Sequence, residues 1–374
     1  MLITSQFDGG NIEVISAEKA DEIRLQIRKD NQSDFYQWFY FHLSGVEDQL
    51  CTLIIENAGG AAYADGWKDY NVCASYDRES WFRIPTDYDG TKLTFELDCE
   101  QNGVYFAYFA PYSMERHHDL IANAAQTGIV TPHVLGHTID GQSIDMLELG
   151  LGAEGRKPVW LIARQHPGET MAEWWMEGAL DMLTDMDDPV TRALLDAYHF
   201  YIVPNMNPDG SKRGHLRTNA AGVNLNRVWN NPSLETSPEV YHVRAKMAET
   251  GVAFHLDVHG DEALPYNFIA GYEGIPDLTE AHLQLLDTYQ THLVNLSPDF
   301  QREHGYPIAS PGNANMSLCT NYIAHAHQCL AMTLEMPFKD NANLPDPVFG
   351  WSPERCGHLA RACLSALLRM KDAL

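Results

Sequence analysis

Over the first 115 residues, hydrophobic and polar positions alternate in short runs. Seven segments are rich in Ile, Val, Phe, Tyr and Trp, and several of them show the two-residue period of half-buried strands. These segments are 12–15, 22–27, 37–42, 50–56, 81–84, 92–99 and 104–109. Clusters of turn-forming residues such as Asp8-Gly9-Gly10 lie between them. Many short strands joined by turns predict an N-terminal antiparallel β-sandwich over residues 1–115.

From about residue 120 the pattern changes to strands that alternate with helices. Continuous apolar runs, which are typical of a sheet buried on both faces, predict strands at 158–163, 198–203, 252–258 and 329–335, with another strand at 130–137. Helices are predicted over 170–186, 238–250, 278–296 and 352–374, the first with an acidic stripe facing solvent. This rhythm predicts a mixed-sheet α/β domain over residues 116–374. No linker rich in Gly or Ser separates the two parts, so we expect them to pack together.

The composition narrows the class of partner. The chain has 25 Lys and Arg residues against 51 Asp and Glu, a net charge of −26. That charge argues against nucleic acid and against anionic membrane surfaces, both of which attract basic patches. The sequence has neither an 18-residue apolar stretch nor a secretory signal at its N-terminus. Its 7 cysteines include no C-x-x-C pair, which favours reduced thiols and a cytoplasmic protein. The oligomeric state stays open.

Two of the predicted strands are followed by metal-binding residue types. His166-Pro167-Gly168-Glu169 comes after the strand at 158–163, and His259 comes after the strand at 252–258. Sites in open α/β sheets lie beyond the carboxyl ends of the strands. Two His and one Glu are the ligand set of a catalytic zinc with an open position. Although H-x-x-E alone is a weak signal among 17 histidines, this placement predicts one Zn²⁺ per chain, bound by His166, Glu169 and His259.

Further polar residues follow the same pattern of strand ends. A turn at Asn207-Pro208-Asp209-Gly210 follows the strand at 198–203, and Arg217 and Arg227 come after it. The guanidinium group binds a carboxylate with two parallel hydrogen bonds, although an arginine taken alone is more often a solvated surface charge. Glu335 ends an apolar strand, where a carboxylate is costly unless it is paired or functional.

Taken together, these motifs resemble the M14-type zinc metallocarboxypeptidases, most closely the cytosolic carboxypeptidase branch. The order of the matching motifs is His166-Pro167-Gly168-Glu169, Asn207-Pro208-Asp209-Gly210, Asn224-Leu225-Asn226-Arg227, His259 and Glu335. The segment 106–112 is similar to the one that closes the N-terminal β-sandwich of that branch. The resemblance implies a zinc metallocarboxypeptidase that removes C-terminal residues from peptides or proteins, with glutamate as one candidate.

The resemblance also implies a role for each residue. His166, Glu169 and His259 would bind zinc, Glu335 would act as the general base, and Arg217 would stabilise the oxyanion. The substrate's C-terminal carboxylate would be held by Asn226 and Arg227.

The sequence departs from the family pattern at two points. Asn224 stands where members often have an Asp that orients a ligand histidine, and an amide supplies no charge. For the tyrosine that digestive members place over the substrate, Tyr322 is the nearest candidate before Glu335, at a spacing that does not match.

Two other functions stay open from the sequence. A related zinc acylase, acting on small N-acyl amino acids, shares the H-x-x-E, the distant His and the arginine, but usually lacks the N-terminal sandwich. An inactive binding module would keep the fold, although such modules typically lose a ligand, the base or an arginine. Acidic C-termini also stay candidates as substrates, because residues 210–234 contain Lys212, Arg213, Arg217 and Arg227 but no Asp or Glu.

Overall fold

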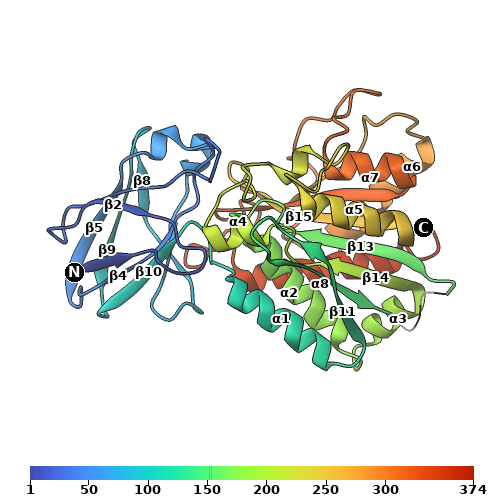
Figure 1. Ribbon diagram of the computed structural model, residues 1–374, viewed down its shortest axis with the longest axis horizontal. Helices are drawn as coiled ribbons and strands as arrows, with labels where there is room; N and C mark the ends of the chain where they lie inside the picture. Colours follow the sequence, from blue (N-terminus) through green and yellow to red (C-terminus); the bar gives the residue numbers. More distant parts are fainter. Residues whose placement is uncertain (151, 153) are drawn as a thin grey trace.

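Two five-stranded sheets form the N-terminal part of the protein (Figure 1, left). The computed structural model describes residues 1–150, 152 and 154–374. One sheet has the strand order β1-β4-β10-β6-β7 and the other the order β2-β3-β5-β9-β8. Their bounds are β1 Leu2–Thr4, β2 Glu13–Ser16, β3 Ile23–Gln26, β4 Tyr40–Ser44, β5 Gln49–Ile55, β6 Val72–Ser75, β7 Phe82–Ile84, β8 Thr86–Tyr88, β9 Leu93–Cys99 and β10 Gly103–Ala107.

Alternation along the strands explains why these residues form a sandwich. In β5, Cys51, Leu53 and Ile55 are buried, while the residues between them are partly exposed. The predicted antiparallel sandwich is confirmed, except that β3 pairs with β5 in parallel. The strands β1, β6 and β8 were not predicted, because runs of three or four residues are too short to show a period.

A seven-stranded mixed sheet forms the centre of the C-terminal part. A mixed sheet was predicted, but its strands at Ser143–Leu149 and Phe268–Ala270 were not. Its order is β11-β12-β14-β13-β15-β17-β16, and the four strands β14, β13, β15 and β17 run parallel. The strands are β11 Val130–His137, β12 Ser143–Leu149, β13 Lys157–Ala163, β14 Tyr198–Val203, β15 Phe254–Asp261, β16 Phe268–Ala270 and β17 Leu330–Pro337. The parallel strands are buried along nearly their whole length, in keeping with their continuous apolar sequence.

Helices cover both sides of this sheet (Figure 1). They are α1 Met114–Gln126, α2 Met171–Thr184, α3 Pro189–Ala197, α4 Pro208–Arg213, α5 Pro238–Thr250, α6 Glu280–Val294, α7 Cys319–His327 and α8 Pro353–Arg369. The prediction for α2 was wrong in one respect. Glu173 does not face solvent: it is fully buried and its carboxylate lies 2.6 Å from Nη1 of Arg164.

The sandwich and the α/β part pack directly on each other, as expected. The Nη2 atom of Arg83 donates hydrogen bonds to the carbonyl oxygens of Phe338 and Trp351, at 2.8 and 3.2 Å. The ring of Tyr108 stacks on that of Phe338, with 4.3 Å between centroids. The proposed boundary between residues 115 and 116 stays a prediction, and α1 spans it.

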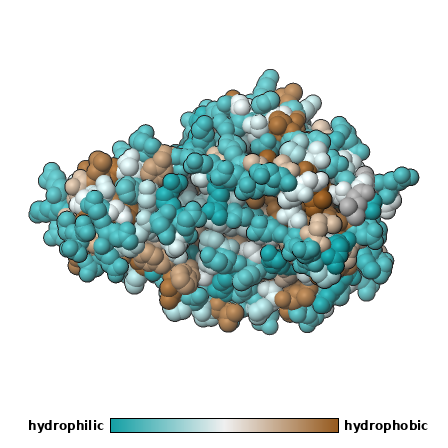
Figure 2. Space-filling model, turned by 90° about the horizontal axis from the view of Figure 1, so that it is seen from below, coloured by the Kyte–Doolittle hydropathy of each residue, from teal (hydrophilic) through white to brown (hydrophobic). Residues whose placement is uncertain are grey.

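The surface seen in Figure 2 is mostly polar, and the cysteines are all inside the protein. Hydrophilic residues dominate the face in Figure 2, and the hydrophobic ones on it are scattered in small patches. Within the described part of the chain, every helix is too short or too polar to cross a membrane. All 7 cysteines are free and buried.

Candidate metal and substrate site

Neighbouring strand ends bring the predicted metal ligands together. His166 and Glu169 lie in the loop that follows β13, and His259 lies on β15, the strand next to β13. On the other side of β15, Glu335 of β17 pairs in register with His259. Because these strands run parallel, residues far apart in the sequence meet where the carboxyl ends of the strands lie side by side.

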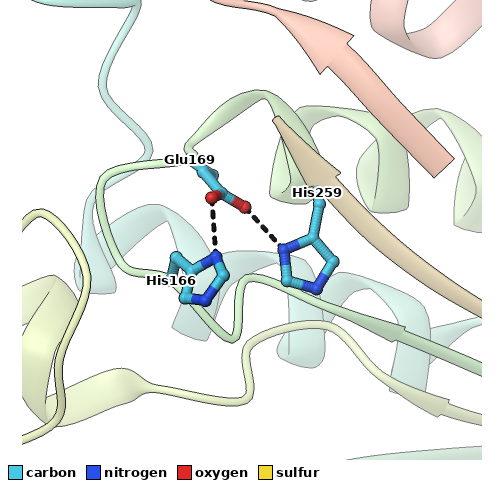
Figure 3. Close-up of side chains that lie close together, drawn as sticks. All are labelled: His166, Glu169 and His259. Carbon is cyan, nitrogen blue, oxygen red and sulfur yellow. Dashed lines mark hydrogen bonds and ion pairs between the residues drawn. The ribbon is translucent and has the colours of Figure 1, made fainter. Parts of the chain in front are cut away.

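The three predicted ligands converge on one another (Figure 3). The Nδ1 atom of His166 lies 2.6 Å from Oε1 of Glu169, and the Nδ1 atom of His259 lies 2.7 Å from Oε2. One ligand atom from each residue falls within 4.8 Å of the others, and all three residues are buried. Two imidazole nitrogens and a carboxylate that face a common point fit a single zinc ion.

The outer nitrogen of each imidazole ring has its own partner. The Nε2 atom of His166 lies 3.1 Å from Oδ1 of Asn224, and that of His259 lies 3.0 Å from Oδ1 of Asp257. These partners hold each ring so that its Nδ1 atom faces Glu169. The predicted contact of Asn224 with a ligand histidine is therefore present.

Two supporting residues were missed at the level of sequence. Asp257 could have been found, because a carboxylate two residues before His259 lies on the same face of the strand. Gln165 donates from Nε2 to Asp257, at 2.6 Å, and accepts from Nε1 of Trp229, at 2.8 Å. Nothing in the sequence pairs Gln165 with residues so far away.

The charges around the cluster shift its pKa values. Burial lowers the pKa of His166 to about 4, and the Arg217 guanidinium adds to this effect. Burial alone would lower the pKa of His259, but Asp257 and Glu169 outweigh it and raise that pKa well above its usual value. Burial would raise the pKa of Glu169, yet the two histidines hold it below its ordinary range.

A cavity of about 360 Å³ opens beside the ligands. Of the seven predicted site residues, six line it, and the seventh, His259, contacts one of them, Glu169. The Nη1 atom of Arg217 is 3.9 Å from Oε1 of Glu169. The six lining residues are His166, Glu169, Arg217, Asn226, Arg227 and Glu335.

The two residues predicted to hold a carboxylate lie side by side in this cavity. Oδ1 of Asn226 accepts a hydrogen bond from the backbone of Cys319, at 2.8 Å, which fixes the orientation of its amide. Nη1 of Arg227 donates to the carbonyl oxygen of Asn226, at 2.7 Å. The other basic residues of 210–234 are not part of the cavity wall: Arg213, for example, pairs with Asp140.

Glu335 has one satisfied and one free oxygen. Its Oε1 atom lies 3.2 Å from the hydroxyl of Tyr306, whereas Oε2 is buried without a hydrogen-bond partner among the described residues. Burial raises the pKa of Glu335 well above its ordinary value; His259 opposes the rise and nearby carboxylates, Glu169 first, add to it. Glu335 is a residue of the cavity wall, and its Oε2 atom keeps a free acceptor there.

Other residues of the cavity wall were missed by the sequence argument. Among them are Tyr306, Glu262 and Tyr63, the last contributed by the N-terminal sandwich. The candidate Tyr322 is not part of the cavity wall, and its ring lies 5.2 Å from the Arg244 guanidinium instead. Tyr306 lies in a segment with no regular secondary structure, so hydrophobic periodicity gives no indication of its position.

Comparisons with known proteins agree with this arrangement. A family model for the cytosolic carboxypeptidase N-terminal domain matches residues 3–109, and one for zinc carboxypeptidases matches residues 117–345. An uncharacterised protein of Zymomonas mobilis is 55% identical over 100% of this chain and 97% of its own length. Human cytosolic carboxypeptidase 1 is 27% identical over 71% of this chain, and the match spans only 26% of that protein.

Solved structures show the same fold over the whole chain. A metallo-carboxypeptidase from Burkholderia cenocepacia is 46% identical, with a TM-score of 0.98 and 100% of both chains covered. A metallo-carboxypeptidase from Pseudomonas aeruginosa, solved in complex with (2-guanidinoethylmercapto)succinic acid, is 44% identical with the same TM-score and coverage. The chain therefore belongs to the M14 zinc carboxypeptidase family, with the N-terminal domain of the cytosolic carboxypeptidases, and it is a carboxypeptidase.

Proposed function

We propose that the protein is a zinc-dependent carboxypeptidase that removes the C-terminal residue of peptides or proteins. One observation carries the proposal: a His–Glu–His cluster, an unpartnered carboxylate oxygen and two arginines share one cavity. An acylase of small N-acyl amino acids is less favoured, because the sandwich and the family match both belong to carboxypeptidases.

The proposed metal ligands are His166, Glu169 and His259, which would hold one zinc ion. When bound there, zinc supplies Lewis acidity and an acidified water near neutral pH. Asn224 and Asp257 hold the two ligand rings in place.

Glu335 is proposed as the general base. Its free Oε2 atom would accept the proton of the attacking water and deliver it to the nitrogen of the leaving amino acid. Arg217 would face the carbonyl oxygen as negative charge develops on it, because its guanidinium lies next to the ligand Glu169 in the same cavity. A preorganised donor of this kind contributes about 3 kcal/mol to transition-state stabilisation.

Arg227 and Asn226 are proposed to bind the substrate's terminal carboxylate. A fixed guanidinium fork beside an oriented amide suits a free carboxylate. A peptide with a blocked C-terminus would lack this anchor, which explains why the reaction would be confined to chain ends. The Pseudomonas aeruginosa relative was solved with a succinic acid derivative, which also offers carboxylates.

Glutamate stays a candidate for the released residue. Among the described residues of the cavity wall, Arg217 and Arg227 are the only Lys or Arg side chains, and both already have proposed roles. The wall also offers the hydroxyls of Thr320 and Thr333, which lie 2.7 Å apart. Because one of these hydroxyls donates to the other, a terminal glutamate would meet one free O–H group there and no third cation, so we expect at most a modest preference for it.

We propose a cytoplasmic location, supported by the 7 free buried thiols and by the cytosolic carboxypeptidase relatives. Fractionation of the source cells tests it: recovery outside the cytoplasmic fraction would contradict it.

The function is tested by digesting a peptide library read by mass spectrometry. Peptides vary only in their last two residues, and each is made with a free and with an amidated C-terminus. We expect loss of the last residue from the free acids alone. Cleavage of the amides at equal rates, or hydrolysis confined to a parallel panel of N-acyl amino acids, would contradict the proposal.

A further inference from the structure

The N-terminal sandwich contacts the catalytic loop at the point where Arg217 stands. We infer that Asp30, a residue of the sandwich, is a positioning residue for Arg217, so that the sandwich forms part of the active site. The inference rests on the proposed role of Arg217 in binding the oxyanion. Three independent sets of contacts carry it: hydrogen bonds to the backbone, close approach at two glycines, and aromatic rings on the guanidinium.

The carboxylate of Asp30 accepts three successive backbone N–H groups of the loop. They belong to Leu216 at 2.6 Å, Arg217 at 2.8 Å and Thr218 at 2.9 Å, and the Thr218 hydroxyl adds a fourth bond at 3.0 Å. Asp30 is only 3% exposed. Hydrogen bonds to an ionised carboxylate are shorter and stronger than neutral ones. The backbone on both sides of the arginine is therefore held by one side chain from the sandwich.

Two glycines allow the sandwich to approach this loop closely. Gly214 and Gly222 both have positive φ, 71° and 74°, which favours glycine. A Cβ atom on Gly214 would lie 2.7 Å from the carbonyl oxygen of Gly9, and one on Gly222 would lie 2.5 Å from that of Gln32. Both clashes are with backbone atoms of the sandwich. The loop is thus fitted to the sandwich on either side of Arg217.

The guanidinium of Arg217 also rests on the sandwich. Its central carbon lies 5.1 Å from the ring centroid of Tyr63 and 5.8 Å from that of Phe35. Gln37 holds Tyr63 in place, because its Oε1 atom accepts from the Tyr63 N–H, at 2.8 Å, and its Nε2 atom donates to the Tyr63 carbonyl, at 3.0 Å. Backbone and side chain of the arginine are both set by the sandwich.

These contacts matter for the rate because a charge stabilises a developing oxyanion only at the correct place. A shift of about 1 Å in a catalytic group can cost about 100-fold in rate. Asp30 does not touch the substrate cavity itself. Its effect on the reaction would therefore pass through Arg217 and would appear in kcat more than in KM.

The test compares Asp30→Asn with a matched control on full-length, zinc-loaded protein. Asn11→Ala removes another buried bond from the sandwich to the same loop, from Nδ2 of Asn11 to the carbonyl of Gly214 at 2.8 Å, together with two bonds between Asn11 and the backbone of Arg28. We expect Asp30→Asn to lower kcat by about 10- to 100-fold with KM changed less than about threefold. Asn11→Ala should lower the Tm while kcat stays within about threefold of wild type.

The decisive measurement is a double-mutant cycle with Arg217→Ala. If Asp30 acts through the arginine, Asp30→Asn has little further effect on kcat once Arg217 is gone. Equal fold losses in both backgrounds would overturn the inference, as would a loss of Tm without loss of kcat. Should Asp30→Asn fail to fold, Thr218→Val removes only one of the four bonds and should lower kcat in the same direction, by less.

Failure of this inference can be told apart from failure of the proposed function. If wild-type protein releases no terminal residue, the proposed function is wrong, and if Arg217→Ala has full activity, the proposed role of Arg217 is wrong. If both behave as proposed but the cycle shows independent effects, only the role of Asp30 is wrong.

Discussion

The Nε2 atom of His166 lies 3.1 Å from the neutral amide oxygen of Asn224. The matching atom of the other ligand histidine faces a carboxylate, Asp257. We therefore expect Asn224→Asp to tighten zinc binding by about 10-fold, because a charged partner makes the imidazole a stronger ligand. Competition with a chromogenic chelator measures this without relying on turnover. Asn231→Asp, which adds the same charge at an exposed site, is the control, and equal zinc affinity in all three proteins would contradict the prediction.

Glu335→Gln is expected to abolish hydrolysis and leave zinc in place. An amide cannot take the proton from water, so kcat should fall by about 100- to 10,000-fold. Elemental analysis should still find one zinc per chain, because Glu335 is outside the predicted ligand set. Glu235→Gln, at an exposed position, controls for the loss of one charge. Full activity in Glu335→Gln would mean that another group is the base.

Replacing Arg227 should weaken binding of free C-termini. Hydrogen bonds to a charged group are worth about 1.5–3 kcal/mol, so Arg227→Gln should raise KM by about 10- to 100-fold. Arg227→Lys should restore little of this loss, because an ammonium group lacks the guanidinium fork. Steady-state kinetics on one peptide, as free acid, give the answer. A fall in kcat with unchanged KM would instead place Arg227 in the chemical step.

Stability should fall as the pH rises, because of Glu239. This residue is fully buried at the start of α5, and burial raises its pKa to about 7, with Asn219 as a hydrogen-bond partner that opposes the rise. An unfolded Glu has a pKa of about 4.3, so the folded state holds the proton more tightly. The resulting stability is complete below about pH 4 and is lost as the pH passes about 7.

Glu239→Gln removes this titration while keeping an acceptor for Asn219. We expect the variant to be more stable than wild type at pH 8, by about 1–3 kcal/mol, and to differ little at pH 5. Urea unfolding at both pH values measures the difference. A constant difference across this range would show that Glu239 does not carry the effect.

Net charge should govern how acidic peptides reach the site. The chain carries −26 overall, although the cavity wall includes Arg217 and Arg227. Raising ionic strength from about 0.01 M to about 0.15 M shortens the Debye length from about 30 Å to about 8 Å. We expect kcat/KM for peptides ending in glutamate to rise over this interval, compared with neutral peptides of equal length. A steady fall with added salt would contradict this view.

Much of the fold follows from local patterns. The buried parallel strands can be recognised in the sequence as apolar runs. Helix α5 begins and ends at the predicted residues: its first residue is a proline, and a glycine follows its last. Elements without a strong period escaped detection, such as the three-residue β16. The face of Glu173 was misjudged because an acidic residue in a helix usually faces solvent, and only the tertiary partner Arg164 makes its burial tolerable.

The seven predicted site residues come together because each stands at or near a strand end or in a recognisable motif. The residues that escaped prediction are those whose role depends on a distant partner. Asp30 lies 186 residues before Leu216 in the sequence, and its own surroundings show only a polar loop. Tyr63 likewise becomes part of the cavity only because the sandwich docks on the α/β part.

Because every thiol is buried, labelling of the cysteines reports where and when the protein unfolds. Cys51, Cys73 and Cys99 lie in the sandwich and the other four in the α/β part, and none is exposed. A reagent that alkylates accessible thiols will find none in the native state, so each adduct marks a moment of unfolding. Mass spectrometry of the adducts after brief exposure to denaturant would thus give the order in which the two halves come apart, with no engineered label.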